Sequence, residues 1–177
     1  IYIMKSEYEI IDNVLNINDF DILEDCMLGN DFPWYFESDI VGSGKALASL
    51  TEEQKNFNFF WAHAIFRENK IRTSENFWNI IQPVINVLNT KALIRVKANA
   101  YNKTPRVIHH ADHIDWKFKH KGALFYLNDN DGVTVLNDGT EVESVANRLL
   151  LFDASRPHHS TTCTDADRRI NINFNYF

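Results

Sequence analysis

The spacing of apolar residues changes near residue 92. Before that point, two stretches at 12–29 and 74–88 carry apolar side chains at intervals of three and four, which predicts amphipathic helices. Ser74 is a good N-cap for the second helix. Pro83 lies inside that stretch, so we expect either a kink or a later start of the helix. Helices are therefore expected to dominate the first half of the chain.

Two other stretches in the first half read as extended chain. Residues 31–39 are aromatic, and residues 56–66 form a dense aromatic run that predicts a buried strand, with a helix as the alternative. From residue 92 onwards the apolar period falls to two, and turn-forming residues separate short segments. We predict eight strands there: 92–101, 107–115, 122–128, 132–136, 140–144, 148–152, 157–162 and 168–177.

This organisation predicts an α+β, mainly β fold, namely a jelly roll buttressed by N-terminal helices. The length of 177 residues suits one domain and is too short for two with a linker. We therefore expect a single domain over 1–177. Residues 1–91 would form a helix-rich support region, and residues 92–177 would form the jelly-roll core.

Two of the predicted strands have one apolar and one polar face. Polar and apolar residues alternate along 93–101 and along 168–177, where Arg169 shares its face with asparagines. We expect the apolar faces to pack on the helix at 74–88. The polar faces should then look at each other across a ligand cavity, although a sheet with its wet side in solvent gives the same pattern.

Composition narrows the class of protein. The chain is 45% hydrophobic and 24% charged, which is typical of a globular protein and excludes a disordered tail. A net charge of −6 makes nucleic acid and anionic membranes poor partners. Two cysteines cannot form a disulfide framework or a multi-cysteine zinc site. No apolar run is long enough to span a membrane, and the charged first ten residues lack a signal-peptide pattern, so a cytoplasmic location is expected.

The histidines point to a metal site. Six of the seven lie between residues 109 and 159. His113 and Asp115 are two apart on a predicted strand and can face the same side, and His158 can join them from a distant strand. Two imidazoles and one carboxylate form a set that suits Fe(II) and leaves coordination positions open. We therefore predict a metal centre at these three residues.

A longer series of motifs follows the same order as in a known family. The matching residues are Arg95-Val96-Lys97-Ala98-Asn99 with Tyr101, His113-Ile114-Asp115, Phe125-Tyr126-Leu127-Asn128, Glu141 to Arg148, Leu151-Phe152-Asp153, His158, Cys163-Thr164-Asp165, and Arg169 leading into Asn173-Phe174-Asn175-Tyr176. From about residue 93 to residue 177, the sequence resembles the 2-oxoglutarate- and Fe(II)-dependent dioxygenases. The resemblance is to the prolyl-4-hydroxylase-like branch and its short phage and marine-bacterial members, and it implies a double-stranded β-helix.

The resemblance also implies the cofactors and the reaction. Fe(II) and the co-substrate 2-oxoglutarate are expected, with ascorbate as an accessory. Arg169 would hold the distal carboxylate of 2-oxoglutarate, and Tyr101 and Tyr126 would hydrogen-bond to the co-substrate. The expected activity is hydroxylation of a peptide or protein side chain, with prolyl favoured, or of a small molecule, with release of succinate and CO2. The carboxylate ligand Asp115 favours hydroxylation over halogenation, which needs a vacancy for halide.

Several neighbouring residues compete for these roles. His110-Ala111-Asp112 repeats the His-x-Asp pattern but should face the other side of its strand, and its spacing to the next motif is three residues too long. His159 competes with His158, and the spacing to the flanking motifs favours His158. Arg168 competes with Arg169, which alone shares the asparagine face. His63, His109 and His120 are expected to be structural or solvent-exposed.

Two readings from other classes remain open. One is a cupin-type metalloprotein, although the His-x-His of cupins is missing from 109–115. The other is a non-enzymatic jelly-roll binding protein whose histidines are incidental. The sequence leaves the primary substrate and the oligomeric state undetermined.

Overall fold

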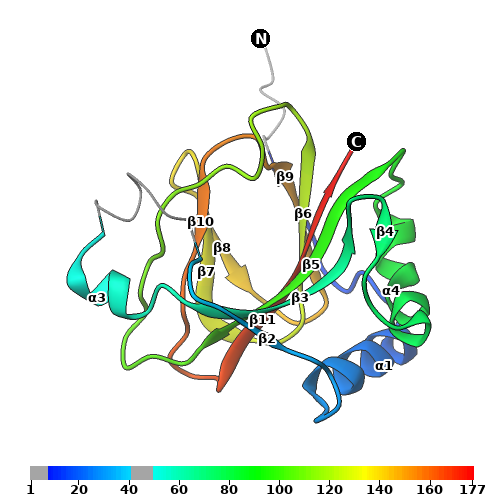
Figure 1. Ribbon diagram of the computed structural model, residues 1–177, viewed down its shortest axis with the longest axis horizontal. Coiled ribbons are helices and arrows are strands. Elements are labelled where there is room, and N and C mark those ends of the chain that lie inside the picture. The colour runs from blue at the N-terminus through cyan, green and yellow to red at the C-terminus, as the bar shows by residue number, and fades with distance from the viewer. Residues whose placement is uncertain (1–7, 41–49) are drawn as a thin grey trace.

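Two antiparallel sheets form most of the computed structural model, which describes residues 8–40 and 50–177 (Figure 1). The larger sheet has eight strands in the order β1-β9-β6-β11-β5-β3-β2, with β4 paired to β3. The smaller sheet has the order β10-β7-β8. The elements are β1 (Tyr8–Ile11), α1 (Ile17–Leu28), β2 (Tyr35–Glu37), α3 (Glu52–Asn56), β3 (Phe60–Arg67), β4 (Lys70–Ile71), α4 (Glu75–Val87), β5 (Leu93–Asn102), β6 (Lys121–Tyr126), β7 (Asn130–Leu136), β8 (Glu141–Ser144), β9 (Arg148–Asp153), β10 (His158–Ser160) and β11 (Arg168–Tyr176).

Both long helices begin at a capping side chain. The Asn16 side chain accepts a hydrogen bond from the backbone N–H of Asp19 at the start of α1, and Ser74 accepts one from Phe77 at the start of α4. Such caps satisfy backbone donors that would otherwise be unpaired. The predicted helix at 74–88 is confirmed, and Pro83 lies inside it.

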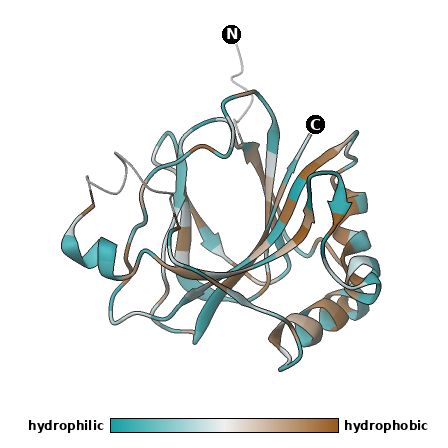
Figure 2. Ribbon diagram, in the orientation of Figure 1, coloured by the Kyte–Doolittle hydropathy of each residue, from teal (hydrophilic) through white to brown (hydrophobic). Residues whose placement is uncertain are grey.

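The main core lies between these helices and the larger sheet. Ile81 and Val84 of α4 are fully buried in one cluster with Val96 of β5 and with Ile172 and Phe174 of β11. The predicted packing of the apolar strand faces on this helix is therefore confirmed. Figure 2 shows that α1 and α4 carry both hydrophobic and hydrophilic positions, as expected for helices that cover one face of a sheet.

The mainly β jelly-roll fold is confirmed, but one prediction about its strands is wrong. Strands β5 and β11 are hydrogen-bonded neighbours, with Ile172 paired to Ala98 and Asn171 paired to Asn99. Their polar faces therefore lie side by side on one wall of the cavity instead of facing each other across it. The opposite wall comes from the smaller sheet, which contacts Arg169 through Thr134 and Ser144.

The predicted strand at 107–115 is also wrong in detail. This segment makes only isolated bridges to the β10 region, His109 to Thr161 and His113 to His158. Of the eight strands predicted after residue 92, seven are therefore regular. Within the described residues, the first 91 positions supply four strands as well as helices, so this half of the chain extends the larger sheet besides supporting it. No helix in the described ranges is long and apolar enough to cross a bilayer.

Candidate active site

The structure brings the side chains of His113, Asp115 and His158 together. Each offers one ligand atom, and these atoms all lie within 4.8 Å of one another. His113 Nε2 is 4.0 Å from Asp115 Oδ1, and the rings of His113 and His158 have centroids 4.5 Å apart. The side chains converge although 43 positions separate the last two along the chain, as their numbers in the sequence show.

Backbone and side-chain hydrogen bonds fix both imidazole rings. The N–H groups of His113 and His158 each donate to the carbonyl oxygen of the other residue at 3.0 Å. Nδ1 of His158 lies 3.0 Å from the carbonyl oxygen of Arg156 and must donate its proton there. The lone pair of His158 is therefore on Nε2. A second nitrogen held by a carbonyl in this way is the usual arrangement of a histidine that binds metal.

Asp115 is held as a carboxylate by three neighbours. Arg95 donates to Oδ1 at 2.9 Å, and Asn175 donates to Oδ2 at 2.6 Å. Asn173 approaches Oδ2 at 3.4 Å, and the Asp115 side chain is only 5% exposed. Burial opposes ionisation here, but the charge of Arg95 and the hydrogen bond from Asn175 outweigh it. The pKa of Asp115 therefore lies below its ordinary value.

The pKa values of the two histidines shift in the direction that leaves a lone pair on each ring free to bind a metal. Burial, reinforced by the neighbouring His158, lowers the pKa of His113 to about 4. Burial likewise lowers the pKa of His158. At neutral pH the cluster consequently holds two neutral imidazoles and one anionic carboxylate. That donor set fits a divalent first-row metal such as Fe(II).

Arg169 lies on β11 with its side chain completely buried. Nε donates to Ser144 Oγ at 2.8 Å, and Nη2 donates to Thr134 Oγ1 at 2.9 Å. Nη1 is buried without a hydrogen-bond partner, and the described part of the chain offers this guanidinium no acidic residue. Burial lowers the pKa of Arg169, as expected for a cation that lacks a counter-ion. A buried unpaired charge is costly, so this site fits an anion supplied from outside the protein.

The surroundings of Arg169 are closely fitted to its side chain. A Cβ placed on Gly132 would lie 2.5 Å from Arg169 Cδ, so only glycine leaves room for the arginine at this point. The rings of Tyr101 and Tyr126 each lie 5.7 Å from the guanidinium carbon. Burial raises the pKa of both tyrosines, which keeps their hydroxyl groups protonated. The Tyr126 hydroxyl donates to Thr134 Oγ1 at 2.8 Å.

Three residues of this pocket were missed by sequence reasoning, namely Gly132, Thr134 and Ser144. Thr134 and Ser144 accept the hydrogen bonds of Arg169, and Gly132 gives it space. The available signal was the alternation along β7, where small or polar side chains at 132 and 134 interrupt an apolar strand. That signal identifies a face, but it does not say which residue of another sheet meets that face.

The competing residues take other positions. His110 is buried with Nδ1 2.8 Å from Ser160 Oγ, whereas the Asp112 side chain is 70% exposed, so this His-x-Asp pair does not converge. His159 points away from His158 and contacts Asp112 at 2.6 Å. Arg168 is only partly buried. The expectation that His110 and Asp112 face the other side of a strand is wrong in its reason, because 107–115 is not a regular strand.

A groove opens beside the three-residue cluster. It has a volume of about 1020 Å³ and is lined by Arg95, Lys97, Trp116, Tyr35 and Phe60, among others. Trp116 lies here with the Arg95 guanidinium 4.7 Å from its ring. We call this cavity the β3–β5 groove. Since Arg95 also donates to Asp115, this side chain connects the groove to the cluster.

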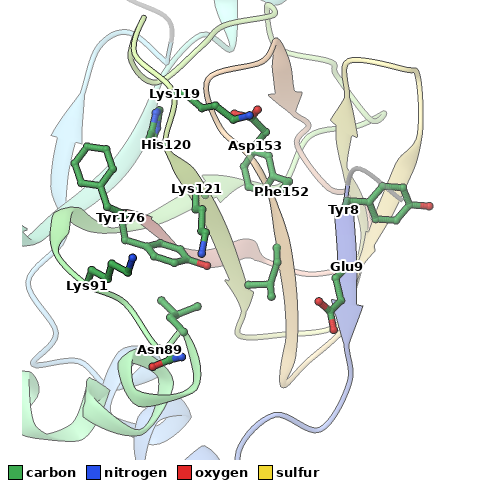
Figure 3. A pocket seen from close by; sticks show the side chains of 14 residues that line it. Tyr8, Glu9, Asn89, Lys91, Lys119, His120, Lys121, Phe152, Asp153 and Tyr176 are labelled. Carbon is green, nitrogen blue, oxygen red and sulfur yellow. The ribbon is translucent and has the colours of Figure 1, made fainter. Parts of the chain in front are cut away.

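A second hollow, of about 1270 Å³, lies elsewhere (Figure 3). Figure 3 shows Lys91, Lys121 and Tyr176 along one side of it and Glu9 on β1 at another. Its lining contains none of the six predicted site residues. The lining of the β3–β5 groove contains none of them either, but Arg95 in that lining donates to Asp115, so we place the chemistry beside the β3–β5 groove.

Similarity to known structures supports the fold. No family model matches the sequence, and no curated protein matches it. Among solved structures, a prolyl hydroxylase from Trichoplax adhaerens, in complex with a hypoxia inducible factor oxygen degradation domain peptide, superposes with a TM-score of 0.64 at 14% identity, covering 97% of this chain and 84% of that one. A viral collagen prolyl hydroxylase from Paramecium Bursaria Chlorella virus-1, as a 2-oxoglutarate complex, gives 0.59 at 12%, covering 97% and 96%.

A third match differs in its chemistry. The non-heme α-ketoglutarate-dependent epimerase SnoN from nogalamycin biosynthesis gives a TM-score of 0.61 at 13% identity, covering 97% of this chain and 76% of that one. The chain therefore has the double-stranded β-helix fold of the prolyl hydroxylases and other 2-oxoglutarate/Fe(II) oxygenases over nearly its whole length. A shared fold does not itself assign a reaction, which must come from the site.

Proposed function

We propose that this protein is an Fe(II)- and 2-oxoglutarate-dependent hydroxylase. The observation that carries the proposal is a His–Asp–His cluster together with a completely buried arginine that has no acidic partner among the described residues. Strand β11 links the two, because Asn175 donates to Asp115 and Arg169 lies on the same face of that strand. A metal centre alone would suit a cupin, and a polar cavity alone would suit a binding protein. The combination matches a co-substrate that chelates metal at one end and carries a carboxylate at the other.

The three clustered side chains are proposed as the iron ligands. His158 presents Nε2 because Nδ1 is engaged by a carbonyl, and Asp115 is held anionic by Arg95 and Asn175. When bound, Fe(II) would supply the redox chemistry that couples decarboxylation of 2-oxoglutarate to oxidation of a substrate C–H bond. The protein contributes ligand geometry and a protected cavity.

Arg169 is proposed to bind the distal carboxylate of 2-oxoglutarate through Nη1, the guanidinium nitrogen that has no hydrogen-bond partner in the described chain. Thr134 and Ser144 occupy the other two donor positions and fix the guanidinium plane. Because a guanidinium binds carboxylate in a directional way, this fixing would orient the co-substrate toward the metal. Tyr101 and Tyr126 line the same pocket, with both hydroxyl groups protonated.

The β3–β5 groove is proposed as the site of the primary substrate. Its aromatic walls suit an extended peptide, and two of the structurally similar proteins named above are prolyl hydroxylases, so a prolyl side chain is the favoured target. Lys97 enters this groove with its ammonium 4.8 Å from the Phe60 ring and makes no hydrogen bond or ion pair with the described chain. Burial and the nearby Arg95 lower the pKa of Lys97 to about 8.

The decisive experiment needs no primary substrate. Purified protein is incubated with Fe(II), 2-oxoglutarate and air, and succinate is measured with each component omitted in turn. We expect slow succinate release that requires both Fe(II) and 2-oxoglutarate and that disappears in His158→Ala. The assay is repeated with a mixture of proline-containing peptides. If the wild-type protein released no more succinate than His158→Ala under either condition, the proposal would be contradicted.

A further inference from the structure

A second histidine pair lies on the solvent side of the wall that carries His113 and His158. His109 is exposed, and its Nδ1 lies 3.1 Å from Nε2 of His159. Asp112 Oδ1 lies 2.6 Å from Nδ1 of His159. We call these three residues the outer cluster; none of them belongs to the inner cluster of His113, Asp115 and His158.

The backbone holds the outer histidines in register. His109 forms an isolated bridge with Thr161, and the His110 N–H donates to the Ser160 carbonyl oxygen at 3.0 Å. Gln54 of α3 donates to the carbonyl oxygen of His109 at 2.9 Å. In this antiparallel contact, His159 sits diagonally across from His109 on the same face, within reach of its ring. The ring contact therefore follows from the chain path, and it does not depend on long flexible side chains.

The hydrogen bonds also set which ring nitrogen can bind a ligand. A carboxylate only accepts hydrogen bonds, so the 2.6 Å contact requires that Nδ1 of His159 donates to Asp112. The lone pair of His159 is then on Nε2, the atom that faces His109. A carboxylate behind a histidine in this way is the usual outer support of a zinc-binding imidazole.

The spacing of the two facing nitrogens fits one metal ion. Two nitrogens at about 2.0–2.1 Å from a tetrahedral zinc ion lie about 3.3 Å apart, close to the observed 3.1 Å. A hollow of about 410 Å³ is lined by His109, His159, Asp112 and Gln54, which leaves room for water to complete the coordination. Imidazole nitrogen is a favourable ligand for zinc.

We propose that His109 Nδ1 and His159 Nε2 bind a divalent zinc-type cation, with Asp112 as the positioning residue of His159. The site is separate from the proposed iron centre and does not depend on it. The chain neighbours His110 and His158 face the inner cavity, so a cation here ties together the two segments that build the inner cluster. Bound zinc should therefore stabilise the fold.

Calorimetric titration of the chelator-stripped full chain with Zn²⁺ tests the proposal. His109→Gln and His159→Gln should each bind one equivalent of zinc less than the wild-type protein, because glutamine keeps the bulk but offers no imidazole. His113→Ala should retain that equivalent, because it changes only the inner cluster. A zinc stoichiometry in His159→Gln equal to that of the wild-type protein overturns the proposal, whatever the inner cluster binds.

Asp112→Asn tests the positioning role separately. We expect zinc affinity at the outer cluster to fall about 10–100-fold, with the stoichiometry unchanged. The zinc-induced rise in melting temperature should be smaller in this variant and missing in His159→Gln. Equal zinc affinity in Asp112→Asn and the wild-type protein would remove Asp112 from the site. Because these side chains are exposed or lie at the surface, melting curves without zinc should match the wild-type curve and serve as the control for folding.

Discussion

The inner and outer faces of one wall each carry two histidines and a carboxylate, but the two clusters are built differently. On the inner face, three ligand atoms lie within 4.8 Å of one another around a common point. On the outer face the groups form a chain, 3.1 Å from His109 to His159 and 2.6 Å from His159 to Asp112. The Asp115 side chain is 5% exposed, whereas that of Asp112 is 70% exposed.

This difference shows why we propose Asp115 as a metal ligand and Asp112 as a supporting group. Asp115 is fixed from behind by Arg95 and Asn175, so it presents an oxygen to the same space as the imidazoles. Asp112 instead lies behind the His159 ring and acts on its orientation. Only the inner cluster is accompanied by a buried cation, Arg169, the proposed partner of the distal carboxylate of 2-oxoglutarate.

The largest expected difference is between the adjacent residues His158 and His159. His158→Ala removes a proposed ligand and should reduce Fe(II)-dependent succinate release by more than the roughly 10–100-fold that loss of a supporting group costs. His159→Ala, tested in zinc-free buffer, should stay within about threefold of the wild-type rate, because its ring faces away from the cavity. The test measures succinate release by both variants at saturating 2-oxoglutarate. Equal losses of rate in the two variants would contradict the assignment of His158 to the inner cluster and His159 to the outer one.

Arg169 and Arg168 form the second matched pair. Arg169→Met should leave metal binding nearly intact and raise the 2-oxoglutarate concentration for half-maximal rate. The loss of one buried charged partner is worth about 2–5 kcal/mol, or about thirty-fold to several thousand-fold in affinity. Arg168→Met should change that concentration little, since this side chain is only partly buried. Succinate release measured against 2-oxoglutarate concentration decides between them, and a larger effect from Arg168 would remove the co-substrate assignment.

Gly132 and Gly139 test the space around Arg169. Gly132→Ala puts a methyl group 2.5 Å from Arg169 Cδ, and overpacking of this kind costs about 1–3 kcal/mol of unfolding free energy. Gly139→Ala meets no atom within 4 Å but strains a φ of +85°, which costs about 1–2 kcal/mol. Urea unfolding should show both losses. Only Gly132→Ala should also weaken 2-oxoglutarate binding, and unchanged binding in that variant would mean that the arginine can shift freely.

The last expected effect is a pH dependence of stability to which buried histidines such as His110 contribute. Burial, with the charge of Arg169, lowers the pKa of His110 to about 3. In the unfolded chain this histidine is protonated near pH 6.5, whereas in the folded chain it stays neutral at that pH. The free energy of unfolding therefore falls as pH falls below about 6.5. Between pH 7 and pH 5 one such histidine accounts for about 2 kcal/mol.

The test for this effect compares His110→Gln with the wild-type protein. Metal-free protein is unfolded in urea at pH 7, 6 and 5, and the free energies of unfolding are compared. The loss of stability toward pH 5 should become smaller in His110→Gln by about the amount that one buried histidine contributes. If His110→Gln kept the wild-type slope, the unfavourable protonation of His110 would be ruled out.

Local patterns were sufficient to predict much of the site. The His-x-Asp pair and the remote His158 follow from motif spacing, and Arg169 follows from strict alternation on a regular strand, β11. The apolar faces of β5 and β11 and the helix α4 follow from periodicity in the same way. Each of these predictions, except that of His158, depends on the chain within a few residues.

What could not be predicted depends on contacts between distant segments. The backbone of 107–115 bonds to β10 through isolated bridges, and its side chains show no clear period from which this could be derived. The partners of Arg169 come from β7 and β8, so Thr134 and Ser144 become site residues only when the two sheets close. The pairing of β5 with β11 has the same origin and could not be read from either strand alone.

Anomalous diffraction from crystals grown with Mn²⁺ and 2-oxoglutarate tests the central claim most directly. The inner cluster should hold one manganese ion about 2.0–2.2 Å from His113, Asp115 and His158. The distal carboxylate of 2-oxoglutarate should accept a hydrogen bond from Arg169 Nη1 at about 2.7–2.9 Å. A manganese ion found only at the outer cluster, or a 2-oxoglutarate carboxylate bound away from Arg169, would contradict the account.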